Sequence, residues 1–189
     1  MNENVMLMRR AKAQLEGKWV NIALGSLIFI AIMAVASSTY IVELVIYGPL
    51  LFGYLLYLGC NIDTGVNNLN LLFKGFERFT DTLVAGLLYS LAVGVGTVLL
   101  IVPGIIVACG LSMTFFIMVD DQNISGIDAL QQSWNMMKGR KWDFFCLNLR
   151  FLGWILLSIL TCGIGYIFLL PYMMATFQNY YRKLRYGTY

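Results

Sequence analysis

The chain has 189 residues, of which 59% are apolar and only 12% are charged, and its formal net charge is +3. Soluble domains have roughly 45–50% apolar and about 25% charged residues, so a water-soluble fold would leave large apolar patches exposed. The absence of His excludes imidazole catalysis and His-ligated metal sites. The few cations form short clusters beside apolar stretches, which favours a membrane over nucleic acid.

Six long apolar stretches predict an all-α membrane protein with six transmembrane helices, arranged as three hairpins with short amphipathic cytoplasmic helices. In chain order the predicted elements are a basic N-terminal segment (1–17), a hairpin (about 19–62), a short helix (69–79), a second hairpin (about 82–119), an amphipathic helix (125–141) and a third hairpin (about 144–181). We expect residues 1–189 to form a single integral membrane domain.

The positions of Lys and Arg predict the orientation. When the six stretches are threaded alternately through a bilayer, twelve of the 13 cations fall on one side, and Arg150 lies inside the fifth stretch. Because cytoplasmic loops are enriched in Lys and Arg, both termini are expected in the cytoplasm. The first stretch is then an uncleaved signal anchor, since no small-residue cleavage site follows it.

Three similar units are visible along the chain. Glycines at 17, 75 and 139 each stand in a basic-aromatic segment, and Pro49, Pro103 and Pro171 follow them after 32, 28 and 32 residues. Pro49 is expected in the first helical turn of the second stretch, where its missing N–H costs little, whereas Pro171 should kink the sixth. The units indicate either repeats that meet at a central binding site or simply hairpins as the units of insertion.

Small residues recur at four-residue spacing in the second hairpin and are candidates for close helix packing. They are Gly86, Ser90 and Gly94 in the third stretch, and Gly104, Ala108 and Ser112 in the fourth. A tight Pro103-Gly104 turn makes these helices antiparallel neighbours, so we expect the two faces to meet. The alternative is a groove for a lipid chain or a partner helix.

Ionisable side chains within spans often mark function. Arg150 is a candidate lipid or anion contact, and it could instead pair with a carboxylate or extend to the inner interface. Asp120 and Asp121 end the fourth stretch and are expected to cap a helix, to pair with Lys138 or Arg140, or to be solvated. No motif for a catalytic, cofactor-binding or metal site occurs, so we expect no enzyme and no cofactor.

The helix over 125–141 is predicted to lie on the membrane surface, because Ile127, Leu130, Trp134 and Met137 recur at helical spacing. Together with the N-terminal segment and the 69–79 helix, it would form a polar cytoplasmic face. The outer loops are minimal in comparison.

An ordered series of short motifs resembles a bacterial multi-pass membrane family, catalogued as domain of unknown function 975. The motifs are Pro103-Gly104-Ile105-Ile106, Asp128-Ala129-Leu130 with Ser133, Met137-Lys138-Gly139, Phe151-Leu152-Gly153-Trp154, Gly163-Ile164-Gly165, Leu170-Pro171-Tyr172 and Tyr180-Tyr181. Arg150 departs from the family pattern, which usually has a small polar residue there. The resemblance implies a bacterial inner-membrane protein and no particular activity.

Two functions fit these observations. One is a non-catalytic protein that assembles, anchors or regulates other envelope components through its cytoplasmic face. The other is a small transporter or lipid-handling protein with a site between the repeats, near Arg150 and the small-residue faces. Membrane lipids are the expected partners in either case, with a membrane or cytoplasmic protein added in the first.

Overall fold

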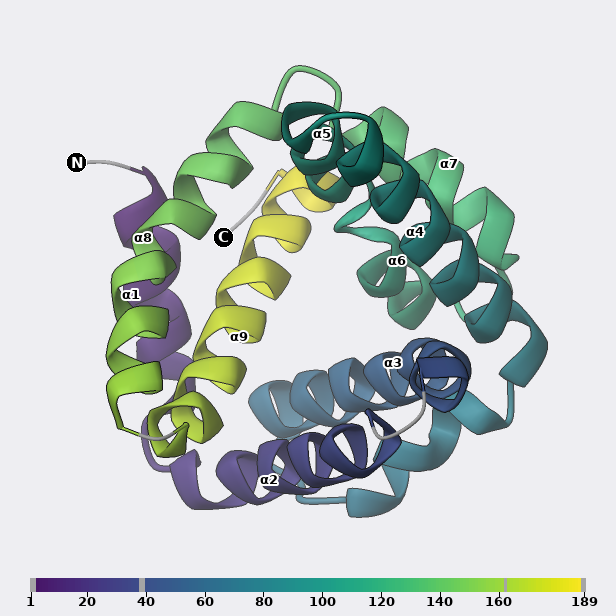
Figure 1. Cartoon of the computed structure of the whole chain (residues 1–189). Coiled ribbons are helices and arrows are strands. Elements are labelled where there is room, and N and C mark those ends of the chain that lie inside the picture. The colour runs from purple at the N-terminus through teal and green to yellow at the C-terminus, as the bar shows by residue number, and fades with distance from the viewer. Residues whose placement is uncertain (1–2, 38–39, 162, 188–189) are drawn as a thin grey trace.

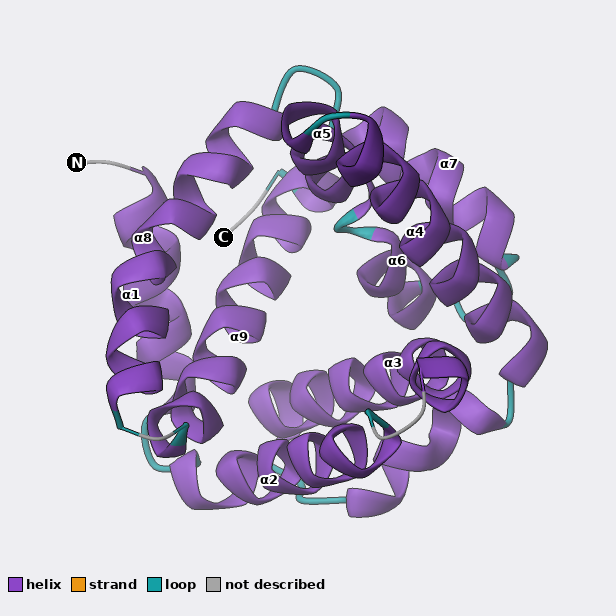
Figure 2. Ribbon diagram, in the orientation of Figure 1, coloured by secondary structure: helices purple, strands orange, loops and turns teal. Residues whose placement is uncertain are grey.

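The computed structural model describes residues 3–37, 40–161 and 163–187. Helices joined by short loops make up this part of the chain, and none of it forms a strand (Figure 2). The all-α prediction is therefore confirmed. The helices are α1 (Glu3–Leu15), α2 (Trp19–Ala36), α3 (Tyr40–Thr64), η1 (Leu69–Phe76), α4 (Phe79–Leu99), α5 (Ile101–Leu111), α6 (Thr114–Asp120), α7 (Gly126–Met136), α8 (Lys141–Leu160) and α9 (Ile164–Tyr186).

Five segments in the described ranges are long and apolar enough to cross a membrane, as expected of a membrane protein. They are Trp19–Ala36, Val42–Thr64, Phe79–Val98, Val102–Asp120 and Lys141–Leu160. The helix α9 is not among them, although it is continuous through Pro171. Its second half carries Gln178, Asn179 and three closing cations, which lower its hydropathy.

The long helices form three hairpins around a common centre (Figure 1). These hairpins are α2–α3, α4 with α5–α6, and α8–α9. The first helix of each hairpin is peripheral: 22% of the residues in each of the α2, α4 and α8 spans are buried. The second helices are more central, because 61% of the α3 span and 56% of the α5–α6 span are buried. Each hairpin thus has an outward helix with exposed apolar side chains and an inward helix that contributes to the core.

The short helices between hairpins follow one cyclic rule. Each packs on the hairpin before it: η1 mainly on α3, and α7 on α4, α5 and α6. The N-terminal α1 has no preceding hairpin and packs on α9, the last helix of the chain. The contacts between hairpins are cyclic too, since α3 packs on α4, α5 on α8 and α9 on α2. The three units seen in the sequence are therefore three units of structure, and α1 closes the ring.

The short helices are anchored by buried side chains. In α1, Leu7, Ala11 and Leu15 lie one helical turn apart and are fully buried. In η1, Leu72 is fully buried and Gly75 lies against the backbone carbonyl of Pro49. The chain after α3 therefore runs back along α3 before α4 begins, and the 69–79 segment is packed into the bundle.

Two predicted boundaries need correction. The apolar residues before Ile46 extend α3 back to Tyr40, so Pro49 lies inside the helix and not in its first turn. The fourth span is interrupted, because residues 112–113 separate α5 from α6.

The face of α7 that packs on α4 consists of small residues. The helix packs through its small residues Gly126, Ala129 and Ser133, whereas Ile127 is 60% exposed. The close approach of α4 explains this choice, since a Cβ on Gly126 would overlap the carbonyl oxygen of Asp81. Small side chains are needed where two helix backbones come this near.

Candidate functional site

A cavity of about 350 Å³ lies where the three hairpins meet. Its walls come from both helices of the second and third hairpins and from α3 of the first. Most of the lining is apolar and aromatic, and Leu51, Phe115, Phe144 and Phe177 are typical members. Sites of this size and composition commonly hold small organic ligands in proteins.

Few polar groups face this cavity, and some are already bonded. The Ser112 hydroxyl donates to the carbonyl of Cys109 at 2.8 Å, and the Asn148 amide donates to the carbonyl of Phe144 at 2.9 Å. The hydroxyls of Tyr47 and Tyr89 line the cavity without a hydrogen bond to any other described residue. Two phenols and the Asn148 carbonyl oxygen therefore remain to orient a largely apolar ligand.

The interruption of the fourth span borders this cavity through Ser112 and Phe115. An interrupted helix leaves backbone groups unpaired, which is costly in a membrane unless protein satisfies them. Here the buried Ser133 hydroxyl of α7 accepts a hydrogen bond from the Met113 N–H at 3.2 Å and donates to the Gly110 carbonyl at 3.0 Å. One side chain thus bridges the two halves of the broken helix.

The neighbouring Trp134 strengthens the same contact. Its indole lies so close to Gly110 that a Cβ at this glycine would stand 2.6 Å from the ring. The Lys141 ammonium, at the start of α8, lies 3.1 Å from the centre of the Trp134 ring, a cation–π contact. The helix α7 therefore joins the second hairpin to the third beside the cavity.

The six small residues singled out in the sequence are distributed over several contacts. Gly86 lies against Gly48 of α3, and Gly94 has no heavy atom within 4 Å of its Cβ position. Gly104 packs on the backbone of Thr97 in α4. The helices α4 and α5 are neighbours, as predicted. Their small-residue faces do not meet along their whole length, because Gly86 packs against α3.

The other three small residues line hollows. Ala108 and Ser112 line the central cavity, and Ser90 lines a separate apolar depression on α4. The groove alternative therefore describes Ala108 and Ser112 better than close helix packing does.

The Arg150 side chain lies away from the central cavity. It is exposed, whereas its neighbours Leu147 and Phe151 on α8 are fully buried. No ion pair or hydrogen bond joins Arg150 to another described residue. The structure does not bring Arg150 together with the small residues, and its proposed lipid contact remains a prediction.

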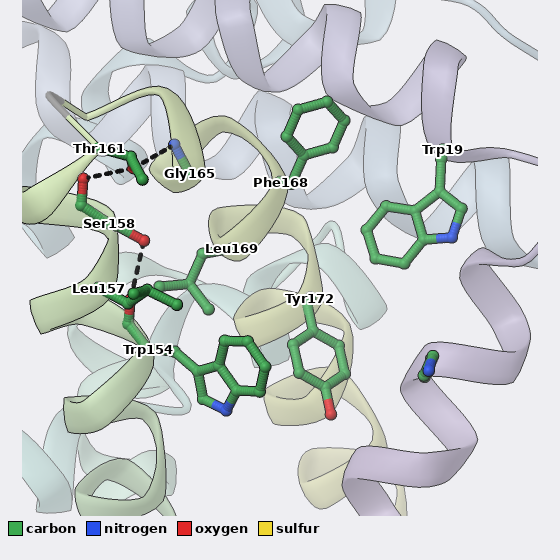
Figure 3. A pocket seen from close by; sticks show the side chains of 10 residues that line it. Trp19, Trp154, Leu157, Ser158, Thr161, Gly165, Phe168, Leu169 and Tyr172 are labelled. Atoms are coloured by element: carbon green, nitrogen blue, oxygen red, sulfur yellow. Dashed lines mark hydrogen bonds between the residues drawn. The ribbon is translucent and has the colours of Figure 1, made fainter.

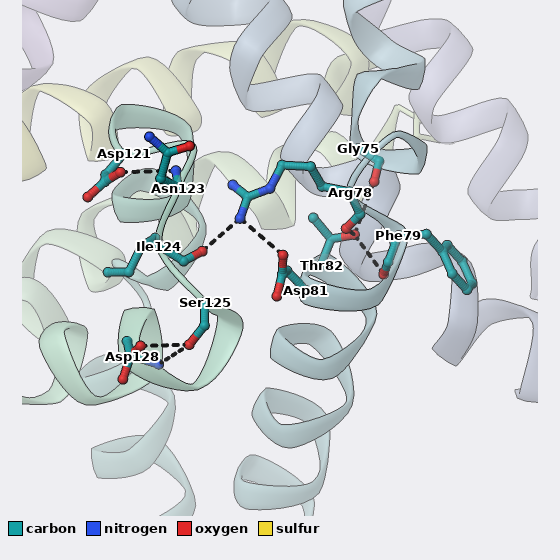
Figure 4. Close-up of polar contacts among 10 residues, drawn as sticks. All are labelled: Gly75, Arg78, Phe79, Asp81, Thr82, Asp121, Asn123, Ile124, Ser125 and Asp128. Carbon is teal, nitrogen blue, oxygen red and sulfur yellow. Dashed lines mark hydrogen bonds and ion pairs between the residues drawn. The ribbon is translucent and has the colours of Figure 1, made fainter.

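A polar network holds the short segments at one end of the bundle (Figure 4). The Arg78 guanidinium, at the start of α4, donates to the Ile124 carbonyl at 2.7 Å and pairs with Asp81 at 3.1 Å. The Thr82 hydroxyl donates to the Gly75 carbonyl at 3.1 Å. Side chains of α4 thus fix both η1 and the loop that precedes α7.

The end of α9 ties two other helices together. Arg185 pairs with Asp120, the last residue of α6, at 2.9 Å, and Arg182 pairs with Asp63 near the end of α3. The hydrogen bond to Asp63 raises the pKa of Arg182, and a hydrogen bond to Asp120 raises the pKa of Tyr186. Asp120 is therefore paired, as one alternative foresaw, but with the C-terminal helix and not with Lys138 or Arg140.

Residues 95–187 match the model of a family described as protein of unknown function, DUF975. The match to DUF975 covers 93 of the 189 residues. The resemblance read from the sequence motifs is thus confirmed. No curated protein and no solved structure matches the chain.

The DUF975 region contains much of what surrounds the cavity. It includes the interrupted α5–α6 span, the bridging residue Ser133 and the whole third hairpin. The remaining wall comes from α3 and from Tyr89 of α4, which precede the matched region. The cavity therefore needs both the DUF975 region and the residues before it.

The sequence did not reveal the cavity or the bridge. Tyr47, Tyr89 and Phe144 are ordinary residues of apolar stretches, and no local pattern shows that they face one hollow. Ser133 carries a weak signal, because it continues the small-residue face of α7 begun by Gly126 and Ala129.

Proposed function

We propose that this protein is a non-catalytic, six-span protein of the bacterial inner membrane that binds a small, largely apolar ligand, such as part of a lipid, in its central cavity. The observation that carries the proposal is the apolar cavity of about 350 Å³ shared by all three hairpins. Repeats in membrane proteins often meet at a ligand site, and such sites are often built beside interrupted helices. Both features occur together here.

The proposed topology places both termini and the short helices in the cytoplasm. The cations at the end of α9 support it, because Lys and Arg favour the cytoplasmic side. A variant without the four native cysteines, carrying Asn135→Cys in α7, tests it. A membrane-impermeant maleimide should label this cysteine only after the inner membrane is opened, whereas Ser37→Cys should be labelled in intact cells. Labelling of Asn135→Cys in intact cells would contradict the topology.

The ligand itself is tested by filling the cavity. Ala108→Phe places a ring in the hollow, so protein purified in mild detergent should lose most of an apolar molecule that the wild-type protein retains. Gly153→Phe is the matched control, because a Cβ at this exposed α8 position has no heavy atom within 4 Å. Equal ligand content in the wild-type and Ala108→Phe proteins, measured by mass spectrometry of organic extracts, would contradict the proposal.

A second candidate function is assembly of other envelope proteins through the inner face. One observation favours it: Phe73, Phe76 and Phe79 form a row of exposed rings, with neighbouring ring centres 6.5 Å apart. Aromatic side chains of this kind are enriched in protein interfaces. A stoichiometric protein that co-purifies with the wild type but not with Phe73→Ser would support this role, and a partner-free protein in several detergents would count against it.

A further inference from the structure

A second hollow, separate from the central cavity, lies where the ring closes. It is a groove of about 450 Å³ between α8 and α9, covered by the junction of α1 and α2. No residue lines both hollows. Figure 3 shows the aromatic rings of Trp19, Trp154, Phe168 and Tyr172 around it.

One end of the groove has its polar groups satisfied within the protein. The Ser158 hydroxyl donates to the Trp154 carbonyl at 2.8 Å, and the Thr161 hydroxyl donates to the Ser158 carbonyl at 3.0 Å. The Thr161 oxygen also accepts from the Gly165 N–H at 3.2 Å. These bonds leave an apolar wall with Leu157, Phe168 and Leu169.

The other end gathers hydrogen-bond donors. The indole nitrogen of Trp154 and the hydroxyl of Tyr172 point the same way, away from Thr161 and Gly165 (Figure 3). Neither of these two groups is hydrogen-bonded to another described residue. An indole N–H can only donate, and a phenol donates readily to an anion.

The remaining lining residue, Lys12, comes from α1. The position of α1 is fixed by hydrogen bonds from the Asn4 amide to the Asp143 carbonyl, at 3.4 Å, and from the Asn179 amide to the Gln14 amide oxygen, at 2.8 Å. Asp143 lies in the first turn of α8 and Asn179 lies beyond Tyr172 in α9, so α1 approaches the groove from its donor-rich end. Lys12 makes no ion pair with another described residue.

The charge and shape of the groove select its occupant. Its lining includes one cation and no carboxylate, with neutral donors beside the cation and an apolar wall beyond them. This arrangement complements a molecule with an anionic head and an apolar chain, and membranes supply such molecules as anionic phospholipids. We propose that the groove binds one anionic phospholipid, with its phosphate at Lys12, Trp154 and Tyr172 and one acyl chain along Leu157 and Phe168.

Native mass spectrometry of the full-length protein in detergent tests this proposal, with palmitoyl-oleoyl phosphatidylglycerol and the corresponding phosphatidylcholine added in turn. The wild-type protein should bind one phosphatidylglycerol in preference to phosphatidylcholine. Lys12→Gln should weaken phosphatidylglycerol binding about tenfold, because a charged hydrogen bond is lost, and should leave phosphatidylcholine binding unchanged. Lys138→Gln, which removes a cation outside the groove, should have no effect.

The chain offers a matched pair for the acyl-chain wall. Leu156 and Leu157 are neighbours in α8 with similar exposure, 60% and 51%, but only Leu157 lines the groove. Leu157→Trp should reduce the binding of both lipids, and Leu156→Trp should not. Equal binding of the two lipids by the wild type, or equal behaviour of the two Trp variants, would overturn the proposal. Ala108→Phe fills only the central cavity and should leave phosphatidylglycerol binding intact. The proposal for the groove and the proposal for the central cavity are therefore tested independently.

Discussion

The contact between α3 and α4 and the contact between α5 and α8 occupy equivalent places in the ring but are built differently. In the first, Gly48 and Gly86 bring two helix backbones together, and a Cβ on Gly86 would stand 3.0 Å from the Cα of Gly48. In the second, Ala108 of α5 and Phe144 of α8 line a hollow between the helices. The same hairpin arrangement therefore gives a closed contact or a cavity, and residue size at the crossing point decides which.

The closed contact is expected to be the least tolerant of added volume. A Cβ on Gly48 would overlap the carbonyl oxygen of Thr82, so backbone must move. We expect Gly48→Ala to lower the free energy of unfolding by about 3 kcal/mol, measured by denaturant titration in mixed micelles. Gly153→Ala adds the same methyl group at an open position in α8 and should be neutral or stabilising by up to about 1 kcal/mol. Equal effects of the two variants would show that the contact is not closed.

The bridge beside the cavity should have the next largest effect. Ser133→Ala removes the hydroxyl that pairs with Gly110 and Met113, and leaving these backbone groups buried and unpaired costs about 1–3 kcal/mol. Ser158→Ala is the control, because that hydroxyl bonds only to the carbonyl four residues earlier in its own helix and its loss is close to neutral. Hydrogen exchange should also rise at residues 112–114 in Ser133→Ala, and unchanged exchange there would argue against the bridge.

The contact between α5 and α8, which contains the cavity, should tolerate a larger side chain that the contact between α3 and α4 does not. Ala108→Phe enters a cavity of about 350 Å³, so we expect the free energy of unfolding to stay within about 1 kcal/mol of the wild-type value, or to rise. The measurement is the same denaturant titration. A loss as large as that of Gly48→Ala would mean that the cavity does not form in the membrane protein.

The smallest effect is expected at the ion pair that joins α9 to α3. Arg182 and Asp63 have side chains that are 35% and 47% exposed, so solvent screens their attraction. A double-mutant cycle with Arg182→Gln and Asp63→Asn should give a coupling free energy of about 0.5 kcal/mol, falling in high salt. A coupling free energy of zero would mean that tyrosines and apolar contacts, and not this ion pair, hold the end of α9 in place.

The parts of the fold that follow from local patterns were predictable. Apolar runs located the long helices, and the glycine and proline spacing indicated a threefold repetition. Gly17 and Gly139, which adopt positive φ angles of 77° and 75°, mark the turns before α2 and α8. These features depend on residues close in sequence, so the sequence alone can reveal them.

The parts that depend on distant residues were not predictable. The interruption at residues 112–113 contains neither Gly nor Pro, and it is satisfied by Ser133, twenty residues away. Gly86 packs on α3 and not on α5. This contact depends on the position of Gly48, which is set by the packing of the first hairpin on the second. The central cavity arises from aromatic side chains of all three hairpins, and only their packing shows that they share one space.

The burial of α1 against α9 has a consequence for biosynthesis. The helix α1 is synthesised before α9, yet its buried face, Leu7, Ala11 and Leu15, packs where α9 closes the ring. That face stays without its native cover until α9 has been made. Closure of the ring therefore waits for α9, and a chain truncated before α9 would leave the apolar face of α1 exposed.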